Sequence, residues 1–318
     1  KYSCWSTYSS QTSMGTHYEN CHITTDADRI WLQTASNEPS IPSDLSSLQM
    51  KHFDVNLYPY GTPEPADVNQ HSIGDCGACA SLASMAYIHP DFIKSIIHRN
   101  SDGTFSVAMY DPQGKGVTVN VTSNFLTKSN GNIAAVSGKD NAATWSTVLE
   151  KAMMKYEMIY NVDPGLEGIG GFYVTPLLTG EGNSFGFDAG VLSGDQLSRV
   201  AKYALAHGKF VVGKFTDVMK IGSLSTVTSH VYTVMLPFTN QSLFEMRNPW
   251  GYNPGGDGSD DGVLNIPLSG QVISDIYFHI IDSGRAGNTG VTMPYTPPSF
   301  AVSSNNIRVD QRLIETRQ

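Results

Sequence analysis

Apolar and polar positions follow a helical pattern in much of the first part of this chain and alternate as in strands over most of the rest. Residues 76–87 contain neither proline nor a β-branched side chain, so they predict a helix that begins at or just before Cys76. Further helices are predicted at residues 91–98, with Asp91 as a cap, and at residues 144–156 and 194–207. Apolar alternation predicts strands at residues 210–215, 230–236, 243–247, 262–266 and 276–281.

These elements divide the chain into four parts. Residues 1–50 are polar and rich in serine and threonine, which predicts an N-terminal extension that either lies across a cleft or packs as an irregular strap. A helix-rich lobe is predicted over residues 51–182 and a β-rich lobe over residues 183–283, and glycines between residues 165 and 182 mark a loop-rich crossing. Residues 284–318 are rich in glycine, proline and serine, which predicts a surface tail.

The composition narrows the class of protein. A chain of 318 residues, 40% of them hydrophobic, can bury a large core, and this argues for a globular protein and against disorder. A formal net charge of −9, with only 20 lysine and arginine residues, argues against a nucleic-acid-binding surface. No apolar run approaches the length of a membrane-spanning helix.

The tripeptide Gly74-Asp75-Cys76 places a thiol where the first predicted helix begins. The positive end of a helix dipole lowers the pKa of a thiol and favours the nucleophilic thiolate. Backbone N–H groups of the same helix start, together with the side-chain amide of Gln70, are candidate donors to an oxyanion. The alternative is that Cys76 is a small buried residue, as most free cysteines are.

His230 and Asn248 are brought together by a predicted hairpin. Pro249 ends the second strand of this hairpin at Asn248, because proline supplies no ladder N–H and restricts the residue before it. Antiparallel pairing sets the start of one strand, His230, beside the end of the next. We expect the Asn248 amide to accept a hydrogen bond from imidazole Nδ1–H, which leaves Nε2 to take the thiol proton.

Taken together, these motifs resemble the protease core of the calpain family of cysteine peptidases, over about residues 60–280. Asp67-Val-Asn-Gln70-His-Ser-Ile-Gly-Asp-Cys76 follows the family's Asp-x-x-Gln-x-x-x-Gly-Asp-Cys pattern without a gap. Trp145-Ser-Thr-Val-Leu-Glu-Lys-Ala152 is similar to the family's Trp-x-x-Leu-Leu-Glu-Lys-Ala helix, and Asn248-Pro-Trp250 to its Asn-Pro-Trp. The resemblance implies an α+β, papain-like, two-lobed fold, in which a helical lobe carries the nucleophile and a β-rich lobe carries the histidine and asparagine.

The resemblance also implies an activity, the hydrolysis of internal peptide bonds of protein or peptide substrates through an acyl-enzyme. Cys76 would attack the carbonyl, while His230 carries the proton between thiol, leaving amine and water. Asn248 would orient His230, Trp250 would shield their hydrogen bond from water, and Gln70 would help to stabilise the oxyanion. Closure of the two lobes would control this site. A thioester acyltransferase of the transpeptidase type shares these residues, and a structural protein that retains the fold is a further alternative.

Cys79 is the rival nucleophile, because Cys76-Gly-Ala-Cys79 also resembles a papain-like motif in which the second cysteine attacks. The oxyanion glutamine of that motif would lie six residues before Cys79, where this chain has Ile73. Gln70 lies six residues before Cys76, so Cys76 is the predicted nucleophile and Cys79 a residue of the helix packing.

Animal members of this family bind calcium in the protease core, although the chemistry itself requires no cofactor. The resemblance implies a first calcium site with the carboxylates of Asp67 and Glu150 as ligands. The second family site would lie in the acidic loop after Trp250, where a family glutamate is replaced by Val263. We expect the aspartates of that loop, Asp257, Asp260 and Asp261, to form a solvated turn instead.

Two further cysteines, Cys4 and Cys21, lie in the N-terminal extension. They are a candidate disulfide if the protein is in an oxidising compartment, which slightly favours a secreted protein over a cytoplasmic one. The chain begins with Lys1 rather than methionine, which predicts a processed form or a fragment. The sequence predicts neither an oligomeric state nor a substrate specificity.

Overall fold

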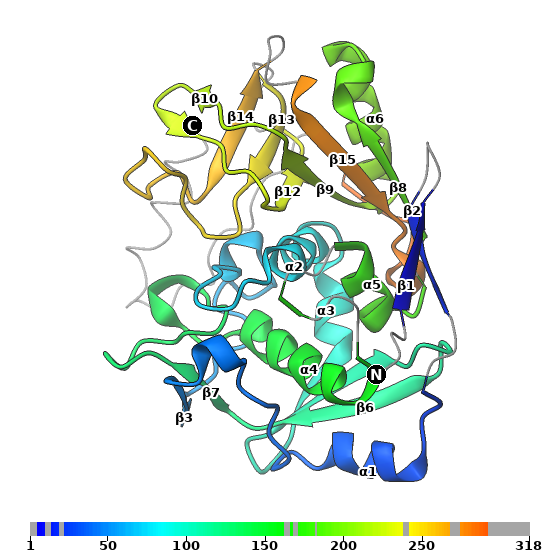
Figure 1. Ribbon diagram of the computed structural model, residues 1–318, viewed down its shortest axis with the longest axis vertical. Coiled ribbons are helices and arrows are strands. Elements are labelled where there is room, and N and C mark those ends of the chain that lie inside the picture. The colour runs from blue at the N-terminus through cyan, green and yellow to red at the C-terminus, as the bar shows by residue number, and fades with distance from the viewer. Residues whose placement is uncertain are drawn as a thin grey trace.

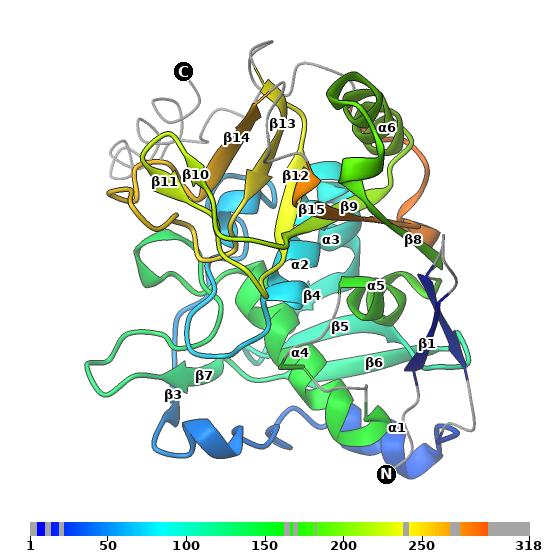
Figure 2. The same ribbon diagram turned by 45° about the horizontal axis from the view of Figure 1, so that its top comes forward.

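The computed structural model describes residues 5–9, 14–18, 22–161, 166–167, 171–181, 183–237, 242–267 and 274–291. Helices gather in one half of the molecule and a large sheet in the other (Figures 1 and 2). This is the mixed helix and sheet architecture of a papain-like α+β fold, as predicted. None of the helices in these ranges is long and apolar enough to cross a membrane.

The helical half is built around α2 (Cys76–Ile88), with α3 (Pro90–Ile96), α4 (Trp145–Tyr160) and α5 (Gly171–Thr179) in the same half (Figure 1). All residues of α2 after Cys76 are buried, as expected for a helix of small and apolar residues that is covered on every side. Two small sheets complete this half. One pairs β4 (Ile97–Arg99), β5 (Phe105–Tyr110) and β6 (Gly116–Val121), and the other pairs β3 (Gln49–His52) with β7 (Asn124–Thr127).

The other half is an antiparallel eight-stranded sheet in the order β1-β2-β8-β15-β9-β12-β13-β14, accompanied by α6 (Gly194–Ala206). Its strands are β1 (Trp5–Ser9), β2 (Met14–Tyr18), β8 (Asn183–Asp188), β9 (Phe210–Phe215), β12 (Tyr232–Met235), β13 (Ser242–Arg247), β14 (Val263–Pro267) and β15 (Ile276–Ile281). The short strands β10 (Lys220–Ile221) and β11 (Leu224–Ser225) pair separately.

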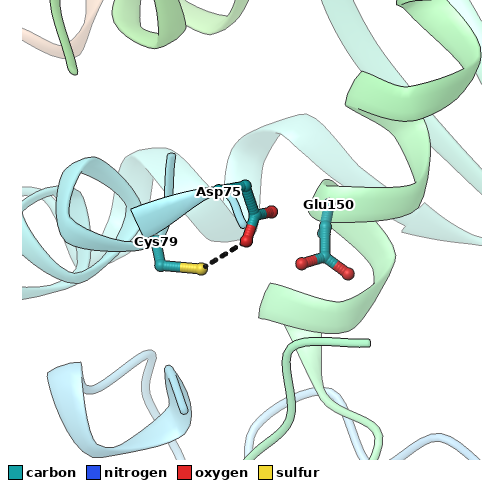
Figure 3. Close-up of side chains that lie close together, drawn as sticks. All are labelled: Asp75, Cys79 and Glu150. Atoms are coloured by element: carbon teal, nitrogen blue, oxygen red, sulfur yellow. Dashed lines mark hydrogen bonds between the residues drawn. The ribbon is translucent and has the colours of Figure 1, made fainter. Parts of the chain in front are cut away.

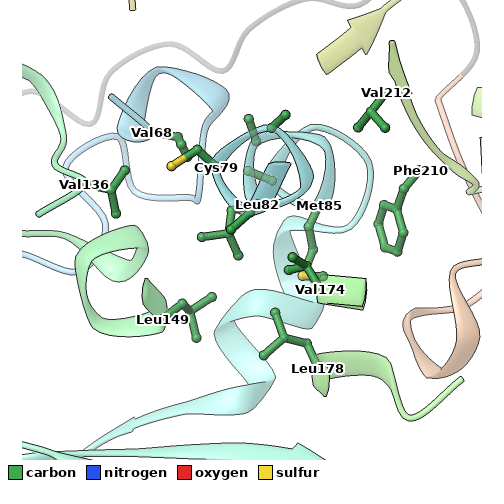
Figure 4. Close-up of a cluster of buried hydrophobic side chains, with 14 of the residues drawn as sticks. Val68, Cys79, Leu82, Met85, Val136, Leu149, Val174, Leu178, Phe210 and Val212 are labelled. Atoms are coloured by element: carbon green, nitrogen blue, oxygen red, sulfur yellow. The ribbon is translucent and has the colours of Figure 1, made fainter. Parts of the chain in front are cut away.

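A continuous hydrophobic core joins the two halves through α2 (Figure 4). Leu82 and Met85 of α2 lie between Leu149 of α4 and Phe210 and Val212 of β9. Two hydrogen bonds tie the same helix to β12 and the residue that follows it. Thr233 Oγ1 donates to the Ala80 carbonyl at 2.7 Å, and the Leu236 N–H donates to the Tyr87 hydroxyl at 3.0 Å. The strand that follows His230 is therefore fixed against the helix that begins at Cys76.

The described parts of the N-terminal segment contact both halves of the molecule. The β1–β2 hairpin extends the large sheet through pairing of β2 with β8, at the end of the sheet away from β12. Helix α1 (Asp26–Gln33) then contacts β6 and α4 in the helical half (Figure 2). Glu38 continues this attachment through an ion pair with the buried Lys151 ammonium at 2.6 Å.

Several predicted elements were correct and others were not. The helices around residues 76, 144 and 194 and the strands after residue 207 are present, with small shifts of their ends. The predicted helix 91–98 ends at Ile96, and residues 97–99 form β4 instead; its cap is His89, with Pro90 in the first turn, not Asp91. The crossing between the lobes is not merely loop, because it contains α5. Strand β8 was missed.

Candidate active site

Cys76 is the first residue of α2 and is the one residue of this helix with partial access to solvent. Asp75 precedes the helix, and its side chain makes no capping hydrogen bond to the first turn. The backbone N–H of Val231 lies beside the Cys76 thiol. The thiol thus reaches Val231, the residue next to His230 in the sequence, and this contact joins the start of α2 to the segment that leads into β12.

The environment of Cys76 raises the pKa of its thiol. Burial is the main cause, and the Asp75 carboxylate adds to the rise, whereas the backbone N–H groups of Val231 and Gly77 lower the pKa. The low thiol pKa predicted from the helix start is therefore wrong for this conformation, because desolvation outweighs the local donors. A base that removes the thiol proton is needed.

His230 and Asn248 form the predicted pair. Pairing of Thr233 with Arg247 sets the register of β12 and β13, and imidazole Nε2 lies 2.7 Å from Asn248 Oδ1. Asn248 Oδ1 also accepts the backbone N–H of Trp250 at 3.0 Å. The Trp250 ring covers the imidazole, with the ring centres 4.6 Å apart.

The ring nitrogen of His230 that faces Asn248 differs from the prediction. Because an amide oxygen can only accept, the hydrogen bond at 2.7 Å requires the proton on Nε2, and Nδ1 is the nitrogen left to take a proton. Strand pairing fixes which residues meet but not the side-chain rotamer, and the sequence therefore could not decide between the nitrogens. Burial lowers the pKa of His230, and the hydrogen bond to Asn248 opposes this change. A neutral imidazole is what a base requires.

Gln70 belongs to a loop that is fastened to the Asn248-Pro249-Trp250 turn. Its backbone N–H donates to the Pro249 carbonyl at 2.7 Å. Its side-chain Nε2 donates to the Ile73 carbonyl at 2.8 Å, which orients the amide within the loop that leads to Cys76. An amide group has two N–H donors, so one remains for a ligand.

Arg247 is a positioning residue that the sequence reasoning missed. Its fully buried guanidinium donates to the Val68 carbonyl at 2.7 Å and to Asn69 Oδ1 at 3.1 Å, and its Nε lies 3.9 Å from Asp261 Oδ2. These contacts join the end of β13, directly before Asn248, to the loop that carries Gln70. An arginine in a predicted strand, directly before Asn-Pro-Trp, was the available signal.

Asp261 is not part of a solvated turn. It is 2% exposed and forms a 2.8 Å ion pair with Lys139, in addition to its contact with Arg247. Its partners lie far away in the sequence, which is why residue types within the loop did not reveal its burial. Asp257 is exposed and bonds to Ser259, as expected of a turn. Asp260 accepts a hydrogen bond from Asn253 at 3.0 Å.

Cys79 is buried on the side of α2 that faces α4 (Figure 3). Its Sγ lies 3.3 Å from Asp75 Oδ1, and its thiol, Asp75 and Glu150 form a close buried group. Burial and the two carboxylates raise the pKa of the Cys79 thiol well above its usual value. This environment opposes thiolate formation, and it favours Cys76 over Cys79 as the nucleophile.

Asp67 and Glu150, the candidate calcium ligands, are both buried. Asp67 Oδ2 accepts from Trp145 Nε1 at 2.8 Å and from the Glu64 backbone N–H at 2.9 Å, and Glu150 Oε1 accepts from the Val136 N–H at 3.0 Å. Among the described residues, Asp67 Oδ1 and Glu150 Oε2 have no hydrogen-bond donor, as a cation ligand requires. The close group that contains Glu150, however, includes Asp75 and Cys79 rather than Asp67. Cys4 and Cys21 lie outside the described residues.

Comparison with known proteins agrees with this geometry. The sequence model of calpain family cysteine proteases matches residues 42–261, which contain Gln70, Cys76, His230 and Asn248. The chain is 27% identical to human calpain-8 over 202 residues, which are 58% of this chain and 28% of that protein. The matched region thus spans little more than a quarter of the relative. Because the family match covers more than half of the chain, this protein belongs to the calpain family of cysteine proteases.

Proposed function

We propose that this chain is a cysteine endopeptidase that hydrolyses internal peptide bonds of protein substrates through an acyl-enzyme on Cys76. The observation that carries the proposal is the His230–Asn248 pair, with Nε2 and Oδ1 2.7 Å apart, whose neighbour Val231 lies against the Cys76 thiol. Cys76, His230 and Asn248 would then act as nucleophile, base and orienting residue, the three roles that acyl transfer requires.

In this mechanism His230 Nδ1 takes the thiol proton as Cys76 Sγ attacks the substrate carbonyl. The backbone N–H of Cys76 lies in the first turn of α2 and needs no intrahelical partner, so it is available to the oxyanion beside the second Gln70 N–H. The imidazolium then gives its proton to the leaving amine, and the neutral ring activates the water that cleaves the thioester. Asn248 holds the ring, and Trp250 excludes water from their hydrogen bond.

The raised pKa of Cys76 and the lowered pKa of His230 favour the neutral pair in the resting site. We therefore infer that proton transfer accompanies attack instead of preceding it. This makes His230 essential even at a pH where an isolated thiol begins to ionise.

The experiment that tests this function is mass spectrometry after reaction with an epoxide inhibitor of thiol proteases. Wild type should be labelled on Cys76, and His230→Ala should lose most of the labelling while its circular dichroism spectrum stays folded. A Cys79→Ala variant is the matched control and should keep the labelling. Labelling of Cys79, or equal labelling of Cys76 without His230, would overturn the assignment.

A second measurement separates hydrolysis from transfer. The enzyme is incubated with an unfolded protein substrate, with and without an added primary amine, and the new carboxyl ends are identified by mass spectrometry. Free carboxylates support a peptidase. Amine adducts as the main product would instead support a thioester acyltransferase.

We also propose that calcium acts on this site through Asp67 and Glu150. The support is the pair of buried oxygens, Asp67 Oδ1 and Glu150 Oε2, that have no donor among the described residues. Asp67 lies in the loop that leads to Gln70, so a bound cation would hold this loop in place. Calcium should increase epoxide labelling of wild type but not of Asp67→Asn; labelling that is equal in the two proteins with calcium would contradict this role.

A further inference from the structure

A second cluster of chemically reactive groups lies behind the nucleophile loop. One ligand atom from each of Asp75, Cys79 and Glu150 lies within 4.8 Å of the other two, and Figure 3 shows the side chains directed toward a common point between α2 and α4. The three residues are at most 1% exposed. Asp75 directly precedes Cys76, and Cys79 lies about one helical turn after it. The acyl-enzyme mechanism gives none of the three residues a role.

Cationic side chains of the described residues do not pair with the acidic groups of this cluster. Within the described part of the chain, no lysine or arginine forms an ion pair with Asp75 or Glu150, and Asp75 Oδ2 and Glu150 Oε2 receive no hydrogen bond from a donor. The neighbouring Glu167 is also acidic and acts on Asp75. Burial of two close carboxylates is costly unless a proton or a cation lies between them, and the hydrogen bond that Asp75 and Glu150 share marks the place where either can bind.

A pocket is lined by residues close in the sequence to Asp75 and Glu150, and two of its lining residues are acidic. It has a volume of about 270 Å³ and is lined by Ile73, two residues before Asp75, and Met154, one turn after Glu150. Glu157 and Glu167 also line it. Two carboxylates at its wall would raise the local concentration of cations in this part of the molecule.

We propose that Asp75, Cys79 and Glu150 bind a thiophilic divalent cation of the zinc class. The ligand atoms are Cys79 Sγ and one carboxylate oxygen from each acidic residue, and a water completes the coordination. Thiolate and carboxylate together suit zinc, whereas calcium and magnesium take only oxygen ligands. This distinguishes the ligand set from that of the proposed calcium site, which has only oxygen ligands. Both sites would use Glu150 Oε2, so the two cations would compete for this atom.

Binding balances as a proton-for-metal exchange. The Cys79 thiol, which now faces Asp75 Oδ1 at 3.3 Å, loses its proton to solvent as the metal–sulfur bond forms, and the proton shared by the Asp75 and Glu150 carboxyls leaves with it. The second oxygen of Glu150 keeps its hydrogen bond from the Val136 N–H, which orients the ligand from outside the site. The cation would fix Asp75, the residue directly before Cys76, and would join α2 to α4.

The test uses cobalt as a spectroscopic substitute for zinc in the chain of 318 residues. All cysteines except Cys79 are replaced, by Cys4→Ser, Cys21→Ser and Cys76→Ala, so that Cys79 is the only thiol. Cobalt should then give a near-ultraviolet thiolate-to-metal band at one equivalent, zinc should abolish it, and zinc should raise the melting temperature. A further Cys79→Ala change should remove both effects.

Carboxylate variants complete the test. Glu150→Gln should weaken cobalt binding by at least about tenfold, since even partners outside the coordination shell contribute about 10–100-fold. Asp67→Asn is the matched control, because it removes another fully buried carboxylate of the same lobe, and it should leave the cobalt affinity unchanged. Circular dichroism without metal confirms that each variant folds, and Asp75→Asn replaces Glu150→Gln if the latter does not.

Three results would overturn the proposal. The first is a folded single-thiol protein that shows neither the band nor a change in melting temperature, which means that a proton alone lies between the carboxyls. The second is a band whose affinity does not change in Glu150→Gln or Asp75→Asn, which means an adventitious thiol complex. The third is that Asp67→Asn weakens cobalt binding as much as Glu150→Gln does, which would place the cation in the Asp67–Glu150 site.

Discussion

The hydrogen bond between His230 and Asn248 gives a sharp prediction for the substitution Asn248→Asp. This change is nearly isosteric, and it replaces the Asn248 Nδ2 group, which has no acceptor among the described residues, by a carboxylate oxygen. The bond itself, 2.7 Å from Nε2 to Oδ1, can be kept. The new negative charge would favour the imidazolium form of His230 and raise its pKa.

The size of the expected rise in the pKa of His230 follows from the distance between the imidazolium and the new carboxylate. Two unit charges about 4 Å apart attract each other by about 4 kcal/mol at an effective dielectric constant of about 20. At about 1.4 kcal/mol per pKa unit this corresponds to at most about 3 units, and pairs of this kind commonly show about 1–3 units. We therefore expect the pKa of His230 to rise from its lowered value by about 1–3 units.

The assay is a titration of the His230 ring by nuclear magnetic resonance in a Cys76→Ala background, which removes the competing thiol. Asn248→Ala is the matched control, because it removes the hydrogen bond without adding a charge, and it should leave the pKa of His230 at or below that of the parent. In the enzyme with Cys76 intact, the acid limb of the kcat/KM profile should move upward with Asn248→Asp. An unchanged or lower His230 pKa in Asn248→Asp would refute the reasoning from this geometry.

Three other substitutions test the positioning network and the buried titratable groups. Arg247→Met removes the donors to Val68 and Asn69 and leaves Asp261 with less compensating charge. The free energy of unfolding, measured by urea denaturation, should fall by about 3–5 kcal/mol. A fall below about 1 kcal/mol would contradict the role of this arginine. Trp145→Phe removes the indole donor to Asp67 and should lower the free energy of unfolding by about 1.5–3 kcal/mol in the same assay. In an Asp67→Asn background the decrease should be clearly smaller, because the hydrogen-bond partner is already changed. Burial, aided by Lys214, lowers the pKa of His279 from 6.5 to about 4, so the unfolded chain takes up a proton at a higher pH than the folded chain. Stability should therefore fall by up to about 3 kcal/mol as the pH drops from 6.5 toward 4, and His279→Gln should flatten this slope; a slope equal to wild type would exclude His279 as its source.

The parts of the site that could be predicted from the sequence are those set by local rules. Proline after Asn248 fixes where a strand ends, and a run of small residues after Cys76 fixes where a helix begins, so the meeting of His230 and Asn248 followed from hairpin geometry. The sequence could not reveal the burial of these groups. Desolvation reversed the expected shift of the Cys76 pKa, and side-chain orientation chose Nε2 of His230 instead of Nδ1.

Helix α5 is an element of the fold that local sequence signals could not reveal. Glycines before residue 171 and Pro176 within the helix weaken the local signal, and they predicted a loop. Val174, Leu177 and Leu178 are buried in the core near α2, so tertiary packing selects the helix. Arg247 and Asp261 were likewise hidden, because their partners lie far along the chain.

The hydrogen bonds between α2 and β12 make a large separation of the two lobes costly. A cleft that opened by separating the lobes would pull β12 from α2, and this would break the buried hydrogen bonds of Thr233 with Ala80 and of Leu236 with Tyr87. It would also separate Arg247 from the Gln70 loop. Each neutral bond contributes about 0.5–1.5 kcal/mol and the buried guanidinium more, in addition to the shared hydrophobic core. The position of β12 against α2 is therefore held by the core of the molecule, and adjustment of the Gln70 loop alone would leave these two bonds intact.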